Sequence, residues 1–173
     1  MATDLSKPLR RDLPPGQGLL RRAHLLLGDL LILAVGQIRP PFRLGVRLLA
    51  FDDAGRVFLI RHSYIPGWHL PGGGVERGET TRAAVAREAA EEGGLRLSAP
   101  PELFGLYLHP TTARLDHIAV YLARGVTRAG APGQGAEIRG ADFFPPDALP
   151  EATSLATRAR ILEALGGPRS DHW

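Results

Sequence analysis

A chain of 173 residues with 44% hydrophobic content is long and apolar enough to fold around one core, which excludes an extended disordered protein. It contains no cysteine, so neither disulfide bonds nor thiolate-bound zinc can stabilise it. The net charge of +3 favours attraction of anionic phosphates, but it does not by itself indicate a nucleic-acid partner.

The N-terminal part of the chain differs in composition from the rest. Residues 1–17 are rich in charges and prolines, which is typical of a flexible tail. Residues 18–40 are expected to form an N-terminal helix that packs on the domain; contact with a membrane surface or with a second copy, as a homodimer, is the alternative. Its apolar stretch, residues 23–38, is shorter than the about 20 residues that span a bilayer, and it contains Asp29. We therefore expect no membrane span and, without an obvious targeting signal, a cytoplasmic protein.

The remaining chain, residues 41–168, is expected to be one domain of the α/β class, of the α+β type. Residues 44–51 and 57–60 have the composition of strands, and the turn residues 52–55 lie between them. This pattern predicts a β-hairpin.

Further strands and helices are predicted in chain order, each bounded by glycine, proline or a capping residue. They are a short strand over 68–70 after the loop 61–67, a helix from Thr80 or Thr81 to Gly93, strands over 102–108 and 117–122, a surface loop over 129–135, a strand over 141–144 and a helix over 154–165.

The first of these helices follows a glycine-rich turn, residues 71–74, and carries several carboxylates. Glu88 lies three residues before Glu91 and four before Glu92, so the three side chains can share one helix face. Like charges at this spacing repel each other, which indicates that they are gathered, with Glu79 nearby, to bind a cation. Oxygen ligands suit hard ions, so the sequence predicts a site for Mg²⁺ or Mn²⁺.

One run of the sequence resembles the signature box of the Nudix hydrolase superfamily, which includes MutT-like proteins. It matches every fixed position of the box: Gly73-x5-Glu79-x7-Arg87-Glu88-Ala89-x-Glu91-Glu92-x-Gly94-Leu95. An alanine-rich amphipathic helix with a solvated acidic face is the alternative, but it explains neither the glycine turn nor Arg87. The resemblance implies a mixed β-sheet sandwiched between helices, and hydrolysis of a diphosphate linked to another moiety, usually in a nucleotide derivative.

The resemblance also implies roles for the box residues. Glu88, Glu91 and Glu92 are expected to be the catalytic metal ligands, and the carbonyl of Gly72 is a lesser candidate. These groups would hold the ion that activates water and neutralises the diphosphate.

Four other box residues have expected structural roles. Glu79 and Arg87 should form a charge pair that braces the loop against the helix, while Gly73 permits the turn and Gly94 the helix exit. Arg87 could alternatively bind a substrate phosphate, because guanidinium groups bind anions through two hydrogen bonds.

The general base has two candidates. Some family members use a glutamate in the loop before the last strand, where this chain has Glu137, and others use a box glutamate. Asp116 and His117 open a strand and could face the cleft; a structural hydrogen bond is the preferred role for His117.

Substrate-binding residues are expected just before the box. Arg61, His62, Tyr64 and Trp68 cluster there; an aromatic ring could stack on a base, Arg61 could hold a phosphate, and Trp68 is the preferred anchor. Pro110 lies fifteen residues after Leu95, a position at which ADP-ribose-type members often have proline.

Three functions follow from the sequence. The first is a Mg²⁺-dependent hydrolase of a small nucleoside diphosphate derivative, such as ADP-ribose, a nucleotide sugar or a nucleoside triphosphate. The second, an RNA 5′-end pyrophosphohydrolase, would need a basic groove; because Lys7 is the only lysine, a nucleic-acid partner is not expected. The third is a catalytically silent ligand sensor or interaction domain, which the complete set of box carboxylates disfavours.

Overall fold

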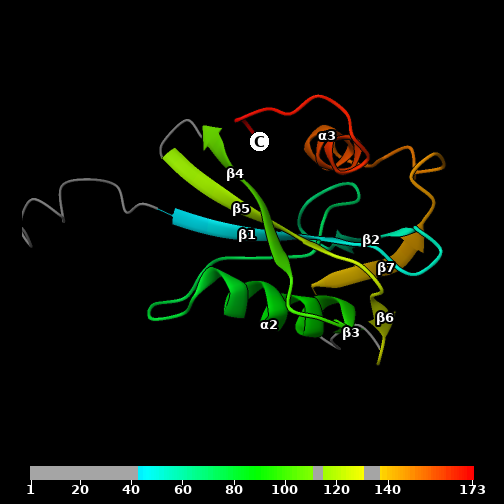
Figure 1. Ribbon diagram of the computed structural model, residues 1–173, viewed down its shortest axis with the longest axis horizontal. Coiled ribbons are helices and arrows are strands. Elements are labelled where there is room, and N and C mark those ends of the chain that lie inside the picture. Colours follow the sequence, from blue (N-terminus) through cyan, green and yellow to red (C-terminus); the bar gives the residue numbers. More distant parts are fainter. Residues whose placement is uncertain (1–42, 111–114, 131–136) are drawn as a thin grey trace, which may run out of the picture. The chain divides into compact units, whose positions relative to one another are not determined.

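Three strands from separate parts of the chain form a mixed sheet. The computed structural model describes residues 43–110, 115–130 and 137–173. Strand β1 (Arg43–Ala50) pairs in parallel with β5 (Leu115–Ala123), and β5 pairs antiparallel with β4 (Glu102–Pro110), as Figure 1 shows. The predicted N-terminal tail and the helix over 18–40 lie outside the described residues.

The predicted hairpin is wrong. β2 (Val57–His62) pairs antiparallel with β7 (Ile138–Phe144), whereas a single bridge, between Phe51 and Val57, joins the ends of β1 and β2. The tight turn does form, because Gly55 N–H donates to the Asp52 carbonyl at 3.0 Å. The two strands then diverge into different sheets, where long-range partners replace the local one.

The segment between the two sheets includes the glycine-rich turn. His69 and Ile60 exchange backbone hydrogen bonds of 2.8 and 2.9 Å, and this bridge stands where the sequence predicts a short strand over 68–70. Farther along, the backbone N–H groups of Leu48 and Val46 donate to the carbonyls of Pro71 and Gly73, both at 2.9 Å. The glycine-rich turn therefore lies along the free edge of β1, and its position is set by the sheet.

Two helices cover opposite faces of the strands, which confirms the predicted sandwich (Figure 1). Helix α2 (Thr81–Gly93) and helix α3 (Leu155–Ala164) each pack against a separate core cluster. The strands alternate between these clusters: Leu48 belongs to the α2 side and Leu49 to the α3 side. This alternation explains why the central strands are apolar on both faces.

Helix α2 has both of its predicted end signals. The Thr80 hydroxyl accepts a hydrogen bond from Ala83 N–H at 3.1 Å, and Gly94 ends the helix in the left-handed conformation, with φ of 57°. Small residues, including Ala84 and Ala89, face the sheet and are buried. The helix can therefore approach the strands closely and still present its carboxylates to the glycine-rich turn.

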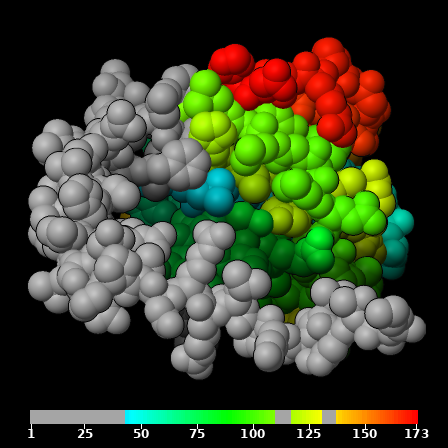
Figure 2. Space-filling model, turned by 60° about the vertical axis from the view of Figure 1, so that its left-hand side comes forward, coloured from blue at the N-terminus to red at the C-terminus, as the bar shows by residue number. Residues whose placement is uncertain are grey.

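The C-terminal residues form an unexpected extra edge on the sheet. Leu108 of β4 accepts from Trp173 N–H at 2.9 Å and donates to the Asp171 carbonyl at 2.8 Å. Figure 2 shows the red C-terminal residues beside the bright green β4. Under this segment, Arg160 donates to Glu163 at 2.7 Å, with both side chains 2% exposed.

The remaining expectations agree with the structure in part. The strands predicted over 102–108, 117–122 and 141–144 are present as β4, β5 and β7 with different ends, and the last predicted helix is α3. Two short strands, β3 (Leu95–Arg96) and β6 (Thr127–Arg128), were not predicted. Most of the predicted loop 129–135 lies outside the described residues. No helix in the described part of the chain is long and apolar enough to cross a membrane.

Candidate functional site

The glycine-rich turn and helix α2 meet through two glutamates. Gly72 N–H donates to the Glu92 carboxyl at 2.7 Å. Gly72 itself has φ of +142°, and a Cβ there would lie 2.9 Å from the Cα of Arg47. At Gly73 a Cβ would collide with the Glu88 carboxylate, 2.7 Å from its Cδ atom. Glycine is therefore required at position 72, where a Cβ would collide with the backbone of β1, and at position 73 it lets the turn lie directly against the Glu88 carboxylate.

Glu92 is the most perturbed of these carboxyl groups. Its side chain is 15% exposed, and burial raises its pKa to about 7; the nearby charges of Glu88 and Glu137 act in the same direction. The Gly72 N–H bond and the charge of Arg47 oppose this increase. A carboxyl group in this setting gains from any additional positive charge that reaches it.

His62, at the end of β2, lies beside Glu92 without a hydrogen bond to it. The distance from Nε2 to the Glu92 carboxyl is 3.7 Å, which is too long for one. Burial lowers the pKa of His62, which disfavours the charged imidazolium beside Glu92. The ring of Tyr64 stands 5.0 Å away, centroid to centroid.

Arg87 joins the two ends of the box. Its Nε and Nη2 donate to the two carboxylate oxygens of Glu79 at 3.0 and 3.1 Å, a bidentate ion pair, and Nη2 also reaches the Gly74 carbonyl at 3.3 Å. Nη1 donates to Glu88 at 2.9 Å and to Glu91 at 3.2 Å. These bonds raise the pKa of Arg87, with the Glu79 pair as the largest cause. A guanidinium held this way is a brace between loop and helix.

Glu91 is more exposed than the other two predicted ligands. Its side chain is 59% exposed, and its carboxylate shares Nη1 of Arg87 with that of Glu88. Within residues 43–110, 115–130 and 137–173, no three acidic or histidine side chains converge as a metal site in this arrangement. The donor types nevertheless fit a hard divalent ion, since the three predicted glutamates offer only oxygen atoms as ligands.

Backbone geometry also fits the predicted contribution of Gly72. The carbonyls of Pro71 and Gly73 accept hydrogen bonds from β1, whereas β1 forms no such bond with the carbonyl of Gly72. Its N–H already points to Glu92, and no described residue donates to its carbonyl. This oxygen therefore has no donor among the described residues and is available to bind a cation.

Glu137 precedes β7 and is close to the site. Its carbonyl accepts from Ser63 N–H at 2.7 Å, which attaches it to the loop after β2. Its negative charge raises the pKa of Glu92 and that of Tyr64, in each case after the larger effect of burial. The structure therefore brings Glu137 close enough to Glu92 for their charges to interact, although the two residues are 45 positions apart in the sequence.

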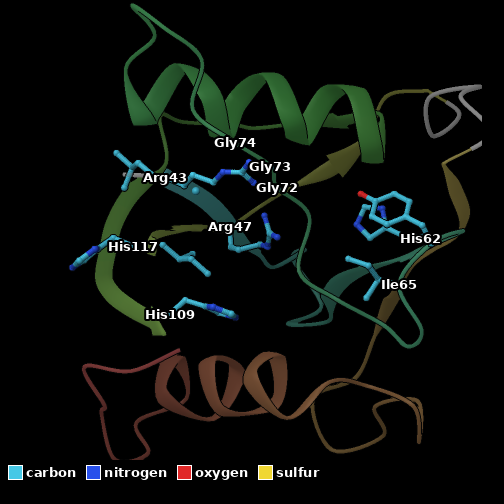
Figure 3. A pocket seen from close by; sticks show the side chains of 13 residues that line it. Arg43, Arg47, His62, Ile65, Gly72, Gly73, Gly74, His109 and His117 are labelled. Carbon is cyan, nitrogen blue, oxygen red and sulfur yellow. The ribbon is translucent and has the colours of Figure 1, made fainter. Parts of the chain in front are cut away.

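A pocket of about 340 Å³ lies beside the turn. Its lining is dominated by glycines and cationic or titratable side chains: Arg43, Leu44, Gly45, Arg47, His62, Tyr64, Ile65, Gly72, Gly73, Gly74, His109, His117 and Ile118. Figure 3 shows Arg47 in the middle of the pocket, with Arg43 and His117 toward one end and His62 toward the other. The volume is that of a small-molecule site.

The sequence prediction missed the arginines of this pocket. Arg43 and Arg47 lie on β1, whose residues 44–51 read as an apolar core strand. A signal was present in the sequence. Arg47 interrupts the apolar run, and because every second residue of a strand points to the same face, Arg47 lies on one face with Arg43 and Gly45. Burial lowers the pKa of Arg47, although the charges of Glu92 and Glu88 act in the opposite direction.

The predicted substrate-binding residues separate into two groups. Tyr64, 64% exposed, lines both this pocket and a neighbouring one of about 370 Å³ that Arg61 also lines. Trp68 packs edge-on against Phe144 at 4.9 Å between centroids, and Arg61 lies over its ring at 5.6 Å. Trp68 lines neither pocket. The side chain of Pro110 lies outside the described residues.

Three comparisons with known proteins bear on this site. The family model of the NUDIX domain matches residues 41–165. A MutT-like protein of Streptomyces ambofaciens is 33% identical over 115 residues, which cover 66% of this chain and 71% of that protein. An RNA pyrophosphohydrolase of Dinoroseobacter shibae is 44% identical over 57 residues, which cover 32% of this chain and 36% of that protein.

A solved structure is also similar to this chain. The crystal structure of a MutT NUDIX hydrolase from Burkholderia pseudomallei superposes with a TM-score of 0.61 and 30% sequence identity. The match covers 70% of this chain and 97% of that chain. The glycine-rich turn, helix α2 and the sheet all lie within the residues that the family model matches.

Proposed function

Because this chain belongs to the NUDIX domain family and is a pyrophosphohydrolase of that family, we propose that it cleaves the diphosphate linkage of a small nucleoside diphosphate derivative. ADP-ribose, a nucleotide sugar and a nucleoside triphosphate are the candidates. The observation that carries the proposal is the position of Glu88 and Glu92, which lie against the glycine-rich turn beside a pocket lined by cationic side chains.

Members of the family generally use divalent metal ions, and we assign Mg²⁺ or Mn²⁺ to this site. Glu88, Glu91, Glu92 and the Gly72 carbonyl would hold the ion. Once bound, a divalent ion neutralises diphosphate charge and lowers the pKa of a bound water. The repulsion between Glu88 and Glu92, visible in the raised pKa of Glu92, supports the assignment because a cation relieves it.

The reaction also requires a group that accepts a proton. Hydrolysis adds the oxygen of water to one phosphorus and breaks the bond from that phosphorus to the bridging oxygen, which departs with the electron pair. We assign the proton from the water to Glu137, with a box glutamate as the alternative. The nearness of Glu137 to Glu92 and Tyr64 supports this role.

Side chains of the loop after β2 are the proposed contacts for the nucleoside. Tyr64 is exposed at the boundary of the two pockets, where its ring can stack on a base, and Arg61 lines the second pocket, where it can hold a phosphate. Trp68 would not contact the substrate itself. It packs against Phe144, and its ring lies under the guanidinium of Arg61 and would hold that group in position. Arg87 would brace the box, since Glu79, Glu88 and Glu91 already engage it.

A substrate panel tests the proposal. Phosphate release should be measured, with coupling to pyrophosphatase or phosphatase, from ADP-ribose, nucleotide sugars, nucleoside triphosphates, dinucleoside polyphosphates and 5′-triphosphorylated RNA. Each reaction is run with Mg²⁺, with Mn²⁺ and with EDTA. Metal-dependent turnover of one small class supports the proposal and identifies the substrate. Turnover confined to the RNA, to which the 57-residue match draws attention, would replace it.

A further inference from the structure

One face of β1 changes character along the strand. Arg43, Gly45 and Arg47 alternate with the core residues on the α2 side, so they share a face with Leu49, which packs beneath α3. His109 is related in the same way to Tyr107 on β4. The part of this face that α3 covers is therefore apolar, and the part beyond α3 is cationic and lines the pocket.

Arg47 has a partly buried charge that is in contact with no carboxylate of residues 43–110, 115–130 and 137–173. Its Nη1 donates to the Val46 carbonyl at 2.9 Å, and no carboxylate of the described residues forms an ion pair with it. Glu88 and Glu92 influence Arg47 only from a longer range. Partly buried guanidinium groups are normally paired, so Arg47, which lines the pocket, has donors available for an anion from outside the protein.

We propose that Arg43 and Arg47 form an anion subsite that receives a phosphate group of the substrate lying beyond the cleaved linkage. This proposal rests on the proposed function, because it specifies the substrate class of the same site. Arg47, in the middle of the pocket, contacts the phosphate nearer to that linkage, and the exposed Arg43, toward one end, contacts the farther one (Figure 3).

The spacing of the two arginines suits a phosphate chain. Positions four apart on a strand are separated by about 13 Å, a distance that two long side chains can share along one extended anion. Gly45 stands between them, and its missing side chain leaves the floor of the pocket open. A planar guanidinium can bind two phosphate oxygens at once, whereas a neutral sugar offers no charge to either arginine. The subsite therefore favours a nucleoside triphosphate over a nucleotide linked to a neutral sugar.

Anion binding without metal tests the subsite directly. Inorganic tripolyphosphate is titrated into the full chain in EDTA by calorimetry, for wild type and for Arg43→Met, Arg47→Met and Arg47→Lys. Loss of either arginine should weaken binding about tenfold or more. The matched control is Arg96→Met, which removes an exposed arginine from β3 and should leave binding unchanged. Arg43 is exposed, so Arg43→Met should remain folded and its tripolyphosphate binding can be measured even if Arg47→Met is unstable.

Kinetics then identify the part of the substrate that the subsite binds. Arg43→Met should lower kcat/KM for a nucleoside triphosphate about tenfold more than that for a nucleotide linked to a neutral sugar, which has no farther phosphate. Equal losses on both substrates would overturn the proposal, because Arg43 would then act on a group that both substrates share. Equal tripolyphosphate binding by wild type and both methionine variants would also overturn it. The calorimetry needs no turnover, so failure of the subsite and failure of the proposed hydrolase are separate results.

Discussion

Gly72 and Glu92 are joined by a 2.7 Å hydrogen bond across twenty residues of sequence, from the backbone of the glycine-rich turn to the side chain of α2. The bond fixes one carboxyl oxygen at the turn and leaves the other facing His62. Since β1 holds the same turn from its other side, the sheet, the turn and the acidic helix form one rigid unit.

The raised pKa of Glu92 predicts how the stability of the metal-free protein depends on pH. In the folded protein the pKa is about 7, above the ordinary value of 4.5, so the folded state binds this proton more tightly than the unfolded state. Stability should therefore fall as the pH rises from 4.5 through 7, by about 3 kcal/mol when fully ionised. Glu92→Gln removes this loss, so the variant should be more stable than wild type at pH 8 in EDTA and nearly equal at pH 4.5. Urea denaturation at the two pH values measures the free energy of unfolding of both proteins. The same difference between variant and wild type at pH 4.5 and at pH 8 would contradict the prediction.

Glu91 and Glu92 are predicted to be essential for turnover but not for folding. Replacing either by glutamine removes one negative charge from the proposed metal site without changing its size, so activity should fall by about 100-fold or more. Mn²⁺ binding, followed by calorimetry, should weaken in parallel. Glu151→Gln, on an exposed loop residue outside the site, is the matched control. Unchanged rates and Mn²⁺ affinity in both variants would remove these residues from the site.

Glu137→Gln separates proton transfer from metal binding. If Glu137 accepts the proton, kcat should fall by about 100-fold or more while the affinity for Mn²⁺ stays near that of wild type. The acidic limb of the pH–rate profile should also disappear. A profile identical to that of wild type would instead indicate a box glutamate as the base. Glu102→Gln, on the exposed face of β4, controls for the loss of charge.

Arg87 and Glu79 are predicted to act as one brace. Arg87→Met leaves Glu79, Glu88 and Glu91 without their shared cation, so the turn and the helix should lose their fixed relation. A misplacement of about 1 Å at a catalytic centre can reduce kcat by about 100-fold. Glu79→Gln should cause a smaller loss, and the double variant should resemble Arg87→Met alone, because the pair acts together. Additive losses in this double-mutant cycle would argue for separate roles.

Arg160 and Glu163 are predicted to dominate the stability of the C-terminal part. Both side chains are 2% exposed, and Glu163 also accepts from the Tyr107 hydroxyl at 2.8 Å. Removing one charge of such a pair leaves the other buried alone, so Glu163→Gln should cost about 3 to 5 kcal/mol. Arg160→Met combined with Glu163→Gln should recover part of that loss. A double variant less stable than either single one would show that the pair does not carry the effect.

The fold was predictable where the signals are local or shared with a family. The box alone indicated the Nudix fold, which the family match and the similar crystal structure confirm. Thr80 and Gly94 ended α2 as predicted because capping depends on residues within one helical turn. The hairpin failed for the opposite reason. The turn at Asp52 is a local feature, but the partners of β1 and β2 are distant in the chain.

The site was predictable only in its acidic half. Its carboxylates follow a fixed spacing along one helix, whereas Arg43 and Arg47 acquire their position from the pairing of β1 with β5 and with the glycine-rich turn. Arg160 and Glu163 were missed for a related reason. Charges three residues apart on a helix usually form a surface pair, and here the return of residues 170–173 to β4 buries them.

That returning segment affects how the protein should be produced. The family match ends at Leu165, and a cloning boundary placed there would discard the residues that cover Arg160 and extend β4. The His172 carbonyl accepts from Arg160 at 2.8 Å, and Ser170 N–H donates to Glu163 at 3.0 Å, so truncation would expose a charged pair and an open strand edge together. Open strand edges promote aggregation. An expression boundary chosen from homology alone should thus make the protein more prone to aggregate, even though every residue of the acidic helix is retained.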